Sequence, residues 1–93
     1  MSTAFTVVHN PAASRFEVSL DGCLSVCAYR RHGDTVDLTH TEVPPALQGH
    51  GIAAGLVRAA LDWARQEKLR VRPLCSYVAV YMRRHPETED LRA

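Results

Sequence analysis

The sequence predicts an α/β (α+β) fold with a mixed, mostly antiparallel sheet, in the element order ββββ-α-β-α. Two observations on periodicity lead to this prediction. Apolar and polar residues alternate in the first half of the chain, which is typical of half-buried strands. After a Pro-Pro break, the apolar residues recur at the spacing of a helix instead. A length of 93 residues suits one modest core, so we expect a single domain over residues 1 to 93.

The first half contains four predicted strands. They span Phe5 to His9, Arg15 to Leu20, Cys23 to Arg30 and Thr35 to Val43. Asp21-Gly22 and Gly33-Asp34 are typical of the tight turns that join neighbouring antiparallel strands. Pro44-Pro45 ends the fourth strand, because neither proline can donate a hydrogen bond to a strand ladder. The four strands are therefore expected to form an antiparallel meander.

The second half contains two predicted helices separated by a fifth strand. The apolar face of the first helix consists of Ile52, Leu56, Val57, Ala60, Leu61 and Ala64. Arg70 to Cys75 follows as the fifth strand, and Pro73 within it indicates a sheet edge or a bulge. The second helix is shorter and must stop near Pro86. One face of this helix consists of Val78, Tyr81, Met82 and His85.

Composition narrows the class of protein. Hydrophobic residues make up 46% and charged residues 23%, which is ordinary for a soluble globular protein. The net charge of +1 argues against a dedicated nucleic-acid surface. No apolar run is long enough for a membrane span, and residues 1 to 8 lack the features of a secretory signal. Three cysteines without a framework spacing predict reduced thiols in a cytoplasmic protein.

The junction between the fourth strand and the first helix predicts an anion site. Its sequence is Gln48-Gly49-His50-Gly51-Ile52-Ala53, and the two glycines let the backbone approach a bulky ligand closely. No Ser, Thr, Asp or Asn stands ready to cap the helix, so its first N–H groups are unclaimed. These amides and the positive end of the helix dipole suit phosphate or pyrophosphate. The sequence therefore predicts a nucleotide-like ligand.

The end of the fourth strand allows two interpretations. Val36 and Leu38 point to the core, so in a regular strand His40 and Glu42 would point to the same face. Because buried charge is costly, such a pair would indicate that the sheet opens there into a ligand cleft. A β-bulge would instead turn both side chains to solvent. The sequence leaves both interpretations open.

This strand–turn–helix segment resembles motif A of the GNAT acetyltransferase superfamily. The signature is Gln or Arg, two free positions, Gly, one free position, then Gly or Ala, and Gln48, Gly51 and Ala53 fill it. The chain is shorter than a typical GNAT domain and is similar to the small single-domain subgroup. Pro73-Leu74-Cys75 and His85-Pro86-Glu87 match the strand end and helix end of that subgroup. The resemblance covers residues 35 to 88.

The resemblance implies acetyl-CoA as co-substrate and no metal. The backbone amides implied to hold its pyrophosphate belong to Gln48, Gly49, His50, Gly51, Ile52, Ala53 and Ala54. The pantetheine arm would pair with backbone near Val43, and the acetyl group would point between the fourth and fifth strands. The position of His50 in the motif accepts many residue types. Cys23 and Cys27 would lie about 13 Å apart along a strand, too far to chelate a metal together.

Acetyl transfer to an amine needs a base, a group that polarises the carbonyl, and an acid for the leaving thiolate. Glu42 stands where many family members keep a general base, although it also suits an exposed strand end. By its interval before His85-Pro86, Tyr81 resembles the family's acid, but it also suits the helix core. His40 could orient Glu42 or replace it as the base, since histidine titrates near neutral pH. The alternative for His40 is an ordinary strand residue with satisfied hydrogen bonds.

Cys75 is the distinctive candidate. It stands just before the second helix, whose N-terminus would lower the pKa of the thiol and raise its nucleophilicity. A thiolate facing the thioester could accept the acetyl group and pass it on. The alternative is a small buried apolar residue, which describes most free cysteines.

The predicted activity is N-acetyl transfer from acetyl-CoA to an unidentified amine. A chain of this length has few residues to line a binding pocket for a small acceptor. We therefore expect a protein acceptor, or a second copy of the chain in a homodimer that helps to bind the acceptor. One alternative is a non-catalytic acyl-CoA-binding or regulatory module. Another is an interaction domain that keeps only the glycine turn.

Overall fold

The computed structural model describes residues 4–93 of the chain, and over these residues it has the predicted order of strands and helices. The strands are β1 (Val8–Asn10), β2 (Arg15–Leu20), β3 (Cys23–His32), β4 (Thr35–Glu42) and β5 (Arg70–Pro73). The helices are α1 (Ile52–Gln66) and α2 (Ser76–Arg84). Short 3₁₀ helices occupy η1 (Pro11–Ala13), η2 (Pro45–Leu47) and η3 (Pro86–Leu91). The predicted α/β fold is confirmed.

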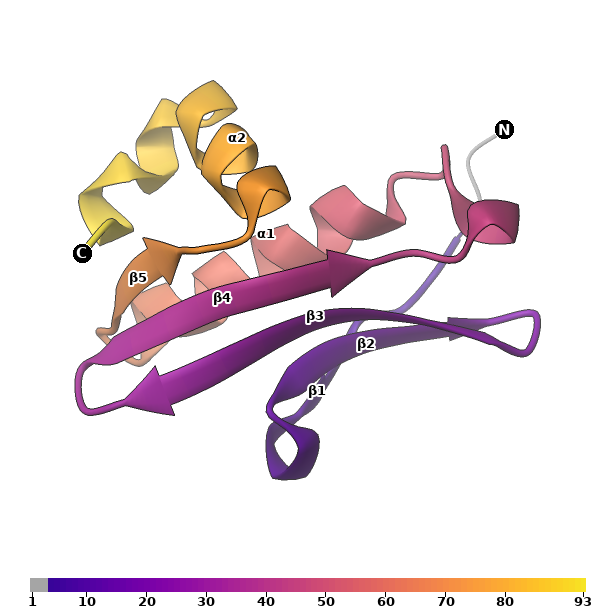
Figure 1. Cartoon of the computed structure of the whole chain (residues 1–93), viewed down its shortest axis with the longest axis horizontal. Coiled ribbons are helices and arrows are strands. Elements are labelled where there is room, and N and C mark those ends of the chain that lie inside the picture. The colour runs from indigo at the N-terminus through magenta and orange to yellow at the C-terminus, as the bar shows by residue number, and fades with distance from the viewer. Residues whose placement is uncertain (1–3) are drawn as a thin grey trace.

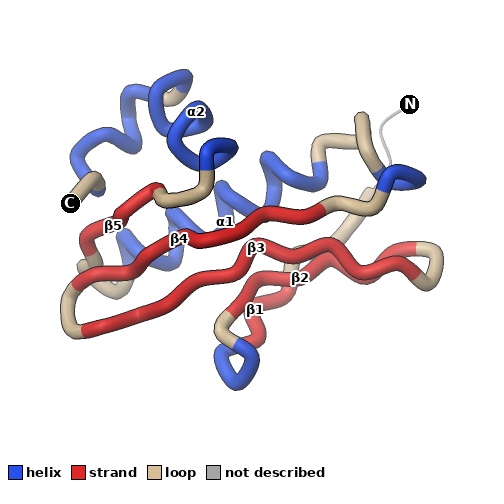
Figure 2. The backbone as a smooth tube through the Cα atoms, viewed as in Figure 1, coloured by secondary structure: helices blue, strands red, loops and turns tan. Residues whose placement is uncertain are grey.

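The five strands form one mixed sheet in the order β1-β2-β3-β4-β5. The first four strands run antiparallel to their neighbours, whereas β4 and β5 are parallel. A parallel neighbour requires a crossover connection, and α1 provides it. Figure 1 shows α1 behind the sheet, with α2 and η3 beyond the β5 side, and Figure 2 shows the five strands as one layer. The opposite face of the sheet carries no helix among residues 4–93.

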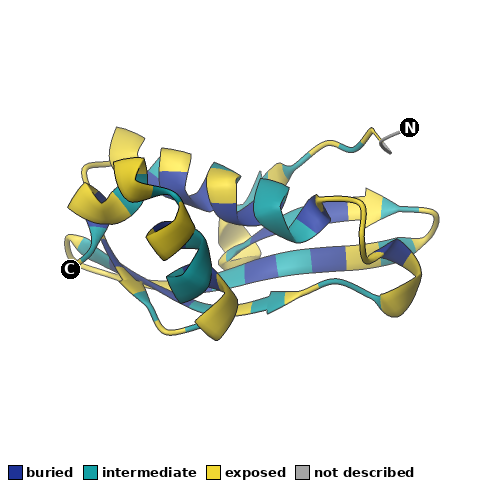
Figure 3. Cartoon of the chain, turned by 90° about the horizontal axis from the view of Figure 1, so that it is seen from above, coloured by how far each residue is buried: buried dark blue, intermediate teal, exposed yellow. Residues whose placement is uncertain are grey.

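The core lies between the sheet and α1. All six predicted apolar positions of α1 are buried, and Figure 3 shows the buried positions of this helix on the side toward the sheet. They pack with buried residues of three strands: Phe16, Val18, Cys27, Tyr29, Val36 and Leu38. Val78 and Met82 of α2 join this core, while Tyr81 and His85 on the same predicted face stay half-buried. In the described part of the chain, no helix is long and apolar enough to cross a membrane.

Several strand boundaries differ from the prediction. β1 ends at Asn10 rather than His9, β3 ends at His32 rather than Arg30, and β4 ends at Glu42 rather than Val43. β1 begins at Val8 rather than Phe5, because Phe5 packs against α1 instead of entering the ladder. A Cβ at Gly55 would lie only 2.7 Å from a ring carbon of Phe5. β5 ends at Pro73 rather than Cys75, which leaves Cys75 as the residue immediately before α2.

A β-bulge in β4 determines which face of the sheet the side chains at the end of this strand lie on. Tyr29 pairs with Leu38 and the preceding Ala28 pairs with His40, so Thr39 has no partner on β3. The extra residue reverses the alternation, and Thr41 then pairs with the buried Cys27 on the helix side. The side chains of His40 and Glu42 face the other side and are 62% and 69% exposed. The interpretation in which both continue the buried stripe is therefore wrong, because the bulge spares the protein a buried charge.

Candidate active site

The glycine turn joins η2 to α1 and presents an uncapped helix start. Gly49 and Gly51 have φ of +86° and +78°, a left-handed conformation that favours glycine. A Cβ at either glycine would meet no atom within 4 Å, so backbone conformation rather than crowding calls for glycine here. Gly51 is the N-cap residue of α1 and no side chain caps the helix. The first N–H groups of α1 lack intrahelical acceptors and remain available to an anion.

Gln48 ties this turn to the end of β4. Its side-chain amide donates a 3.0 Å hydrogen bond from Nε2 to the carbonyl oxygen of Val43. This bond spans η2 and fixes the spacing between the strand end and the glycine turn. It also occupies one backbone group of Val43, the residue near which the resemblance places the pantetheine arm.

An interhelical groove leads from the glycine turn along α1 and α2. Its first section has a volume of about 230 Å³. The lining residues of this section are Val43, Leu47, Gln48, Gly49, Gly51, Ile52, Ala53, Ala54 and Tyr77. Every predicted cofactor residue except His50 is among them, and His50 lies on the exposed side of the turn. The structure thus brings the predicted phosphate amides and Val43 together around one hollow.

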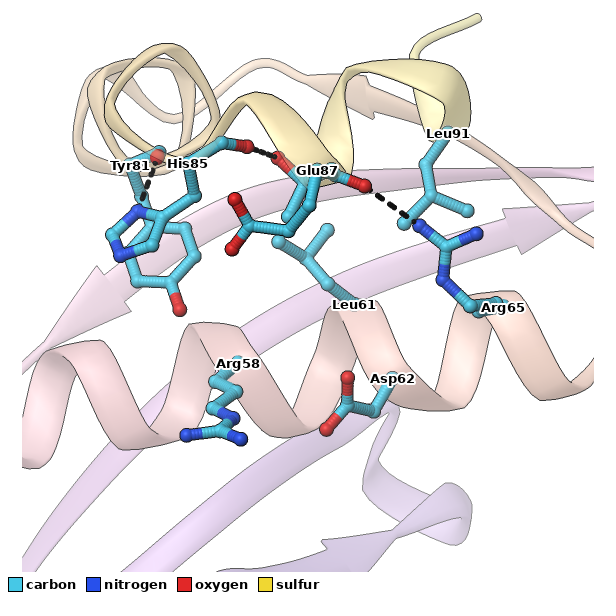
Figure 4. Close-up of a pocket in the computed structure, with 9 residues that line it drawn as sticks. Arg58, Leu61, Asp62, Arg65, Tyr81, His85, Glu87 and Leu91 are labelled. Carbon is cyan, nitrogen blue, oxygen red and sulfur yellow. Dashed lines mark hydrogen bonds between the residues drawn. The ribbon is translucent and has the colours of Figure 1, made fainter.

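Two further sections continue the interhelical groove. The second section, of about 390 Å³, shares Ala54 and Tyr77 with the first and adds Arg58, Tyr81 and Arg84. The third section, of about 310 Å³, lies between α1 and η3 and is shown in Figure 4. It shares Arg58, Tyr81 and His85 with the second section. Shared walls make the three sections one continuous groove.

Cys75 is held where β5 ends and α2 begins. Its backbone N–H donates to the carbonyl oxygen of Leu38 at 3.0 Å. Its thiol donates to Oγ1 of Thr41 at 3.6 Å, and this hydroxyl in turn donates to the thiol of Cys27 at 3.9 Å. Thr41 therefore lies between two sulfur atoms on the helix side of the sheet.

The two thiols have opposite pKa shifts. Burial raises the pKa of Cys75, but the backbone amides of Val78 and Tyr77 and the hydroxyl of Thr41 outweigh it, so the net shift is downward. Burial raises the pKa of Cys27 to about 11. Cys27 is therefore a protonated core residue near neutral pH, and Cys75 is the more easily ionised of the two thiols.

The predicted base lies on the other side of β4 from Cys75. Oε2 of Glu42 lies 3.8 Å from Nε2 of His40, both on the exposed face of the sheet. The β4–β5 ladder ends at Leu38 and Pro73, so the two strands are not paired beyond these residues. A ligand could pass from the helix side of the sheet to the exposed side only beside this unpaired end. The acetyl group is predicted to point between the fourth and fifth strands at this end.

Tyr81 lines the second and third sections of the groove and not the section at the glycine turn. Its ring stacks on His85 with centroids 3.9 Å apart, and Nδ1 of His85 donates to the Tyr81 carbonyl oxygen at 2.8 Å. Burial raises the pKa of Tyr81, so the phenol remains protonated. Figure 4 shows its hydroxyl directed toward α1 near Arg58. The section that contains the glycine turn is lined by Tyr77, one helical turn earlier.

Four residues of this site were missed by the sequence reasoning. Thr41 depends on the bulge, which the sequence left undecided. Tyr77, Arg58 and Arg84 line the groove only because α1 and α2 pack side by side. Their one detectable signal was helical spacing, since Tyr77 and Arg84 lie seven residues apart on α2. Among residues 4–93, no group of three or more His, Cys, Asp or Glu side chains is placed to hold a metal ion.

Comparisons with known proteins find one family model, several relatives and a solved structure that are similar to this chain. The family model for GCN5-related N-acetyl-transferases matches residues 15–91. Protein NATD1 of Xenopus tropicalis is 40% identical over 88 residues, covering 91% of this chain and 81% of that protein. Human protein NATD1 is 41% identical over 83 residues, covering 86% and 74% respectively. A GCN5-like protein of Staphylococcus aureus, solved by NMR, superposes with a TM-score of 0.75 at 21% identity, covering 95% and 87%. The last comparison concerns the fold alone.

Proposed function

The chain belongs to the GCN5-related N-acetyltransferase family, and on this premise we propose that it transfers acetyl groups from acetyl-CoA to an amine. One observation carries the proposal. The uncapped start of α1 and the lowered-pKa thiol of Cys75 flank the same end of β4. An anion site and a nucleophile placed around one strand end match the two ends of an acyl-CoA, its pyrophosphate and its thioester.

The donor would be held mainly by backbone groups. The amides of the glycine turn and the first turn of α1 would bind the pyrophosphate, since they have no competing cap. Val43 and Tyr77 would flank the pantetheine arm in the first section of the groove. With the donor bound in this way, its thioester would point toward Thr41 and Cys75, where β4 and β5 are no longer paired.

Two routes are open to the acetyl group. In the covalent route, Cys75 forms a thioester bond to the acetyl carbon as the bond to the CoA sulfur breaks, and the released thiolate takes up a proton. An amine then attacks the acetyl carbon on Cys75, the bond from this carbon to the Cys75 sulfur breaks, and the sulfur takes up the proton that the amine loses, which restores the free thiol. In the direct route, Glu42 removes the proton of the amine, held in place by His40. We favour the covalent route, because Cys75 lies on the helix side with the groove and Glu42 does not.

The acid for the leaving thiolate is a tyrosine in this proposal. Tyr81 is the residue that the family resemblance indicates, and Tyr77 is the residue that lines the section with the glycine turn. Burial raises the pKa of both phenols, so both hold the proton that such an acid must supply. Tyr77→Phe and Tyr81→Phe assayed side by side would assign the role to the variant with the larger loss of kcat.

A non-catalytic acyl-CoA-binding module is the second candidate function. The separation of Glu42 from Cys75 by the strand favours it, because the base then stands apart from the nucleophile. For an acetyltransferase, the uncovered face of the sheet beside Glu42 would offer access to a protein acceptor or to a second copy of the chain.

The proposed activity is tested with acetyl-CoA labelled in the acetyl group. Intact-mass measurement of the wild type beside Cys75→Ala should show the label on the wild type alone, with delivery to an added amine. Binding without label transfer to any amine or thiol would favour the non-catalytic module. Turnover retained in Cys75→Ala would remove the covalent route. Absence of CoA binding by calorimetry would remove both functions.

A further inference from the structure

We propose that Arg58 and Arg84 form a subsite for the 3′-phosphate on the ribose of CoA, in the second section of the interhelical groove. The inference rests on the proposed function, because it takes CoA as the donor. Its consequence is specificity: the protein would distinguish CoA from dephospho-CoA, which lacks this phosphate. It would likewise distinguish CoA from a phosphopantetheine group carried on another protein.

The two guanidinium groups lack partners of their own. Most arginines among residues 4–93 form an ion pair or a hydrogen bond, as Arg65 does with Asp90 and Arg70 with the carbonyl of Arg92. Arg58 and Arg84 take part in no ion pair or hydrogen bond within the described chain, although both line the second section of the groove. Two unpaired cations that line one section of a groove repel each other unless an anion binds near both. A bound phosphate would remove that repulsion.

Helix geometry brings both arginines to the same section. Arg58 follows Ala54 by one turn, about 6 Å along the axis of α1, and helical side chains lean toward the N-terminus. Its side chain lines the second section of the groove, which Ala54 joins to the section at the glycine turn. Arg84 shares a face of α2 with Tyr77, which lines the first section, and it approaches from the opposite wall. Ala54, a small residue on α1, lines the groove between them.

The charge pattern along the groove restricts a phosphate to this section. No carboxylate lines the second section, where His85 accompanies the two arginines. The third section is instead lined by Asp62 and Glu87, which Figure 4 shows on α1 and η3. Arg65 cannot compensate there, because it bonds Asp90 at 2.8 Å and the Glu87 carbonyl at 3.0 Å. A phosphate is favoured near Arg58 and disfavoured beyond it.

The two phosphate-bearing positions of CoA match two neighbouring regions of the groove. Its 3′-phosphate is carried on the same ribose whose 5′ end bears the pyrophosphate, so the two anionic groups must bind at neighbouring positions. The glycine turn supplies amides for the first group, and the next section of the groove supplies two guanidinium groups for the second. Guanidinium groups bind phosphate through paired, charge-assisted hydrogen bonds.

The test compares CoA with dephospho-CoA by titration calorimetry. We expect wild type to bind dephospho-CoA about tenfold more weakly than CoA. Arg58→Gln and Arg84→Gln should each weaken CoA by several-fold to about tenfold and leave dephospho-CoA unchanged. Arg83→Gln is the matched control, because Arg83 is adjacent, exposed and equally unpaired but lies outside the groove. It should bind both compounds as wild type does.

The outcomes separate this inference from the proposed function. Equal affinities of wild type for CoA and dephospho-CoA would overturn the subsite and leave the proposed donor intact. An equal loss for both compounds in the groove variants would also overturn it, since it would indicate general disruption. If neither compound binds wild type, the proposed function fails, and the subsite fails with it. Circular dichroism of each variant verifies that the fold is kept.

Discussion

The two halves of β4 handle polar groups in opposite ways. From Thr35 to Leu38 the strand is paired on both sides, with β3 and β5. Asp37 in this half is only 3% exposed, and its carboxylate is surrounded by Arg30, His32 and Arg72. Beyond the bulge the strand pairs with β3 alone, and Thr41 shares a half-buried space with Cys75. In the half of β4 that is paired on both sides, the charged Asp37 is held in ion pairs. In the half that is paired with β3 alone, Thr41 and Cys75 remain available to a substrate.

The paired half should dominate stability, and Leu38→Ala tests this with the largest expected effect. Leu38 is fully buried and pairs with both Tyr29 and Pro73, so its truncation leaves a cavity. We expect the free energy of unfolding to fall by about 2–5 kcal/mol in urea titrations. Thr41→Ser, a small change in the other half, is the control and should cost much less. Similar losses for both variants would contradict the division of β4.

The unpaired half should dominate activity, and Cys75→Ser tests this next. Serine keeps the size of the side chain but has a far weaker nucleophile near neutral pH. We expect acetyl transfer to fall at least about a hundredfold while the urea midpoint stays close to wild type. Cys27→Ser is the matched control for a thiol in the same cluster. Because Cys27 is buried, that variant should lose stability rather than chemistry.

The ion pairs around Asp37 should make the free energy of unfolding depend on pH. The hydrogen bond from His32, followed by the charges of His32, Arg72 and Arg30, holds the pKa of Asp37 below its usual value despite opposing burial. A carboxyl whose pKa is lowered by folding stabilises the protein above its unfolded pKa of about 3.9. This contribution is lost as the pH falls through the lower, folded pKa. Acidification should therefore lower the free energy of unfolding of wild type more than that of a variant without this carboxylate.

Asp37→Asn makes that expectation measurable. Wild type should exceed the variant in stability at neutral pH, and the difference should shrink on acidification through the Asp37 titration. Urea titrations from neutral to strongly acid pH provide the measurement. Asp34→Asn is the control, because Asp34 lies in the exposed β3–β4 turn and its side chain makes no ion pair in the described chain. A constant difference across pH would show that the cluster does not act through charge.

The same division explains how far the sequence could be interpreted. Local patterns determine the paired regions, so β2 and the six buried positions of α1 were predicted correctly. The glycine turn was also predicted, because positive φ and a missing cap are local properties. The direction of Glu42 was not, since a bulge depends on how two strands settle against each other. Arg58 and Arg84 lie on separate helices, and only tertiary packing places them across one groove.

Thr41→Val makes the finest distinction, because it changes one hydroxyl and keeps the shape of the side chain. The variant removes the Thr41 hydroxyl, which lies 3.6 Å from the Cys75 sulfur. This hydroxyl lowers the pKa of Cys75, because it can turn and donate to the thiolate once the thiol proton has left. We expect the pH profile of iodoacetamide alkylation at Cys75 to move upward, with a rate near neutral pH several-fold lower. Thr41→Ser restores the hydroxyl and should restore the profile. The amides of Tyr77 and Val78 remain in both variants, so the shift should be partial. An unchanged profile in Thr41→Val would mean that the start of α2 alone sets the reactivity of Cys75, and the bulge would then matter only for turning Glu42 outward.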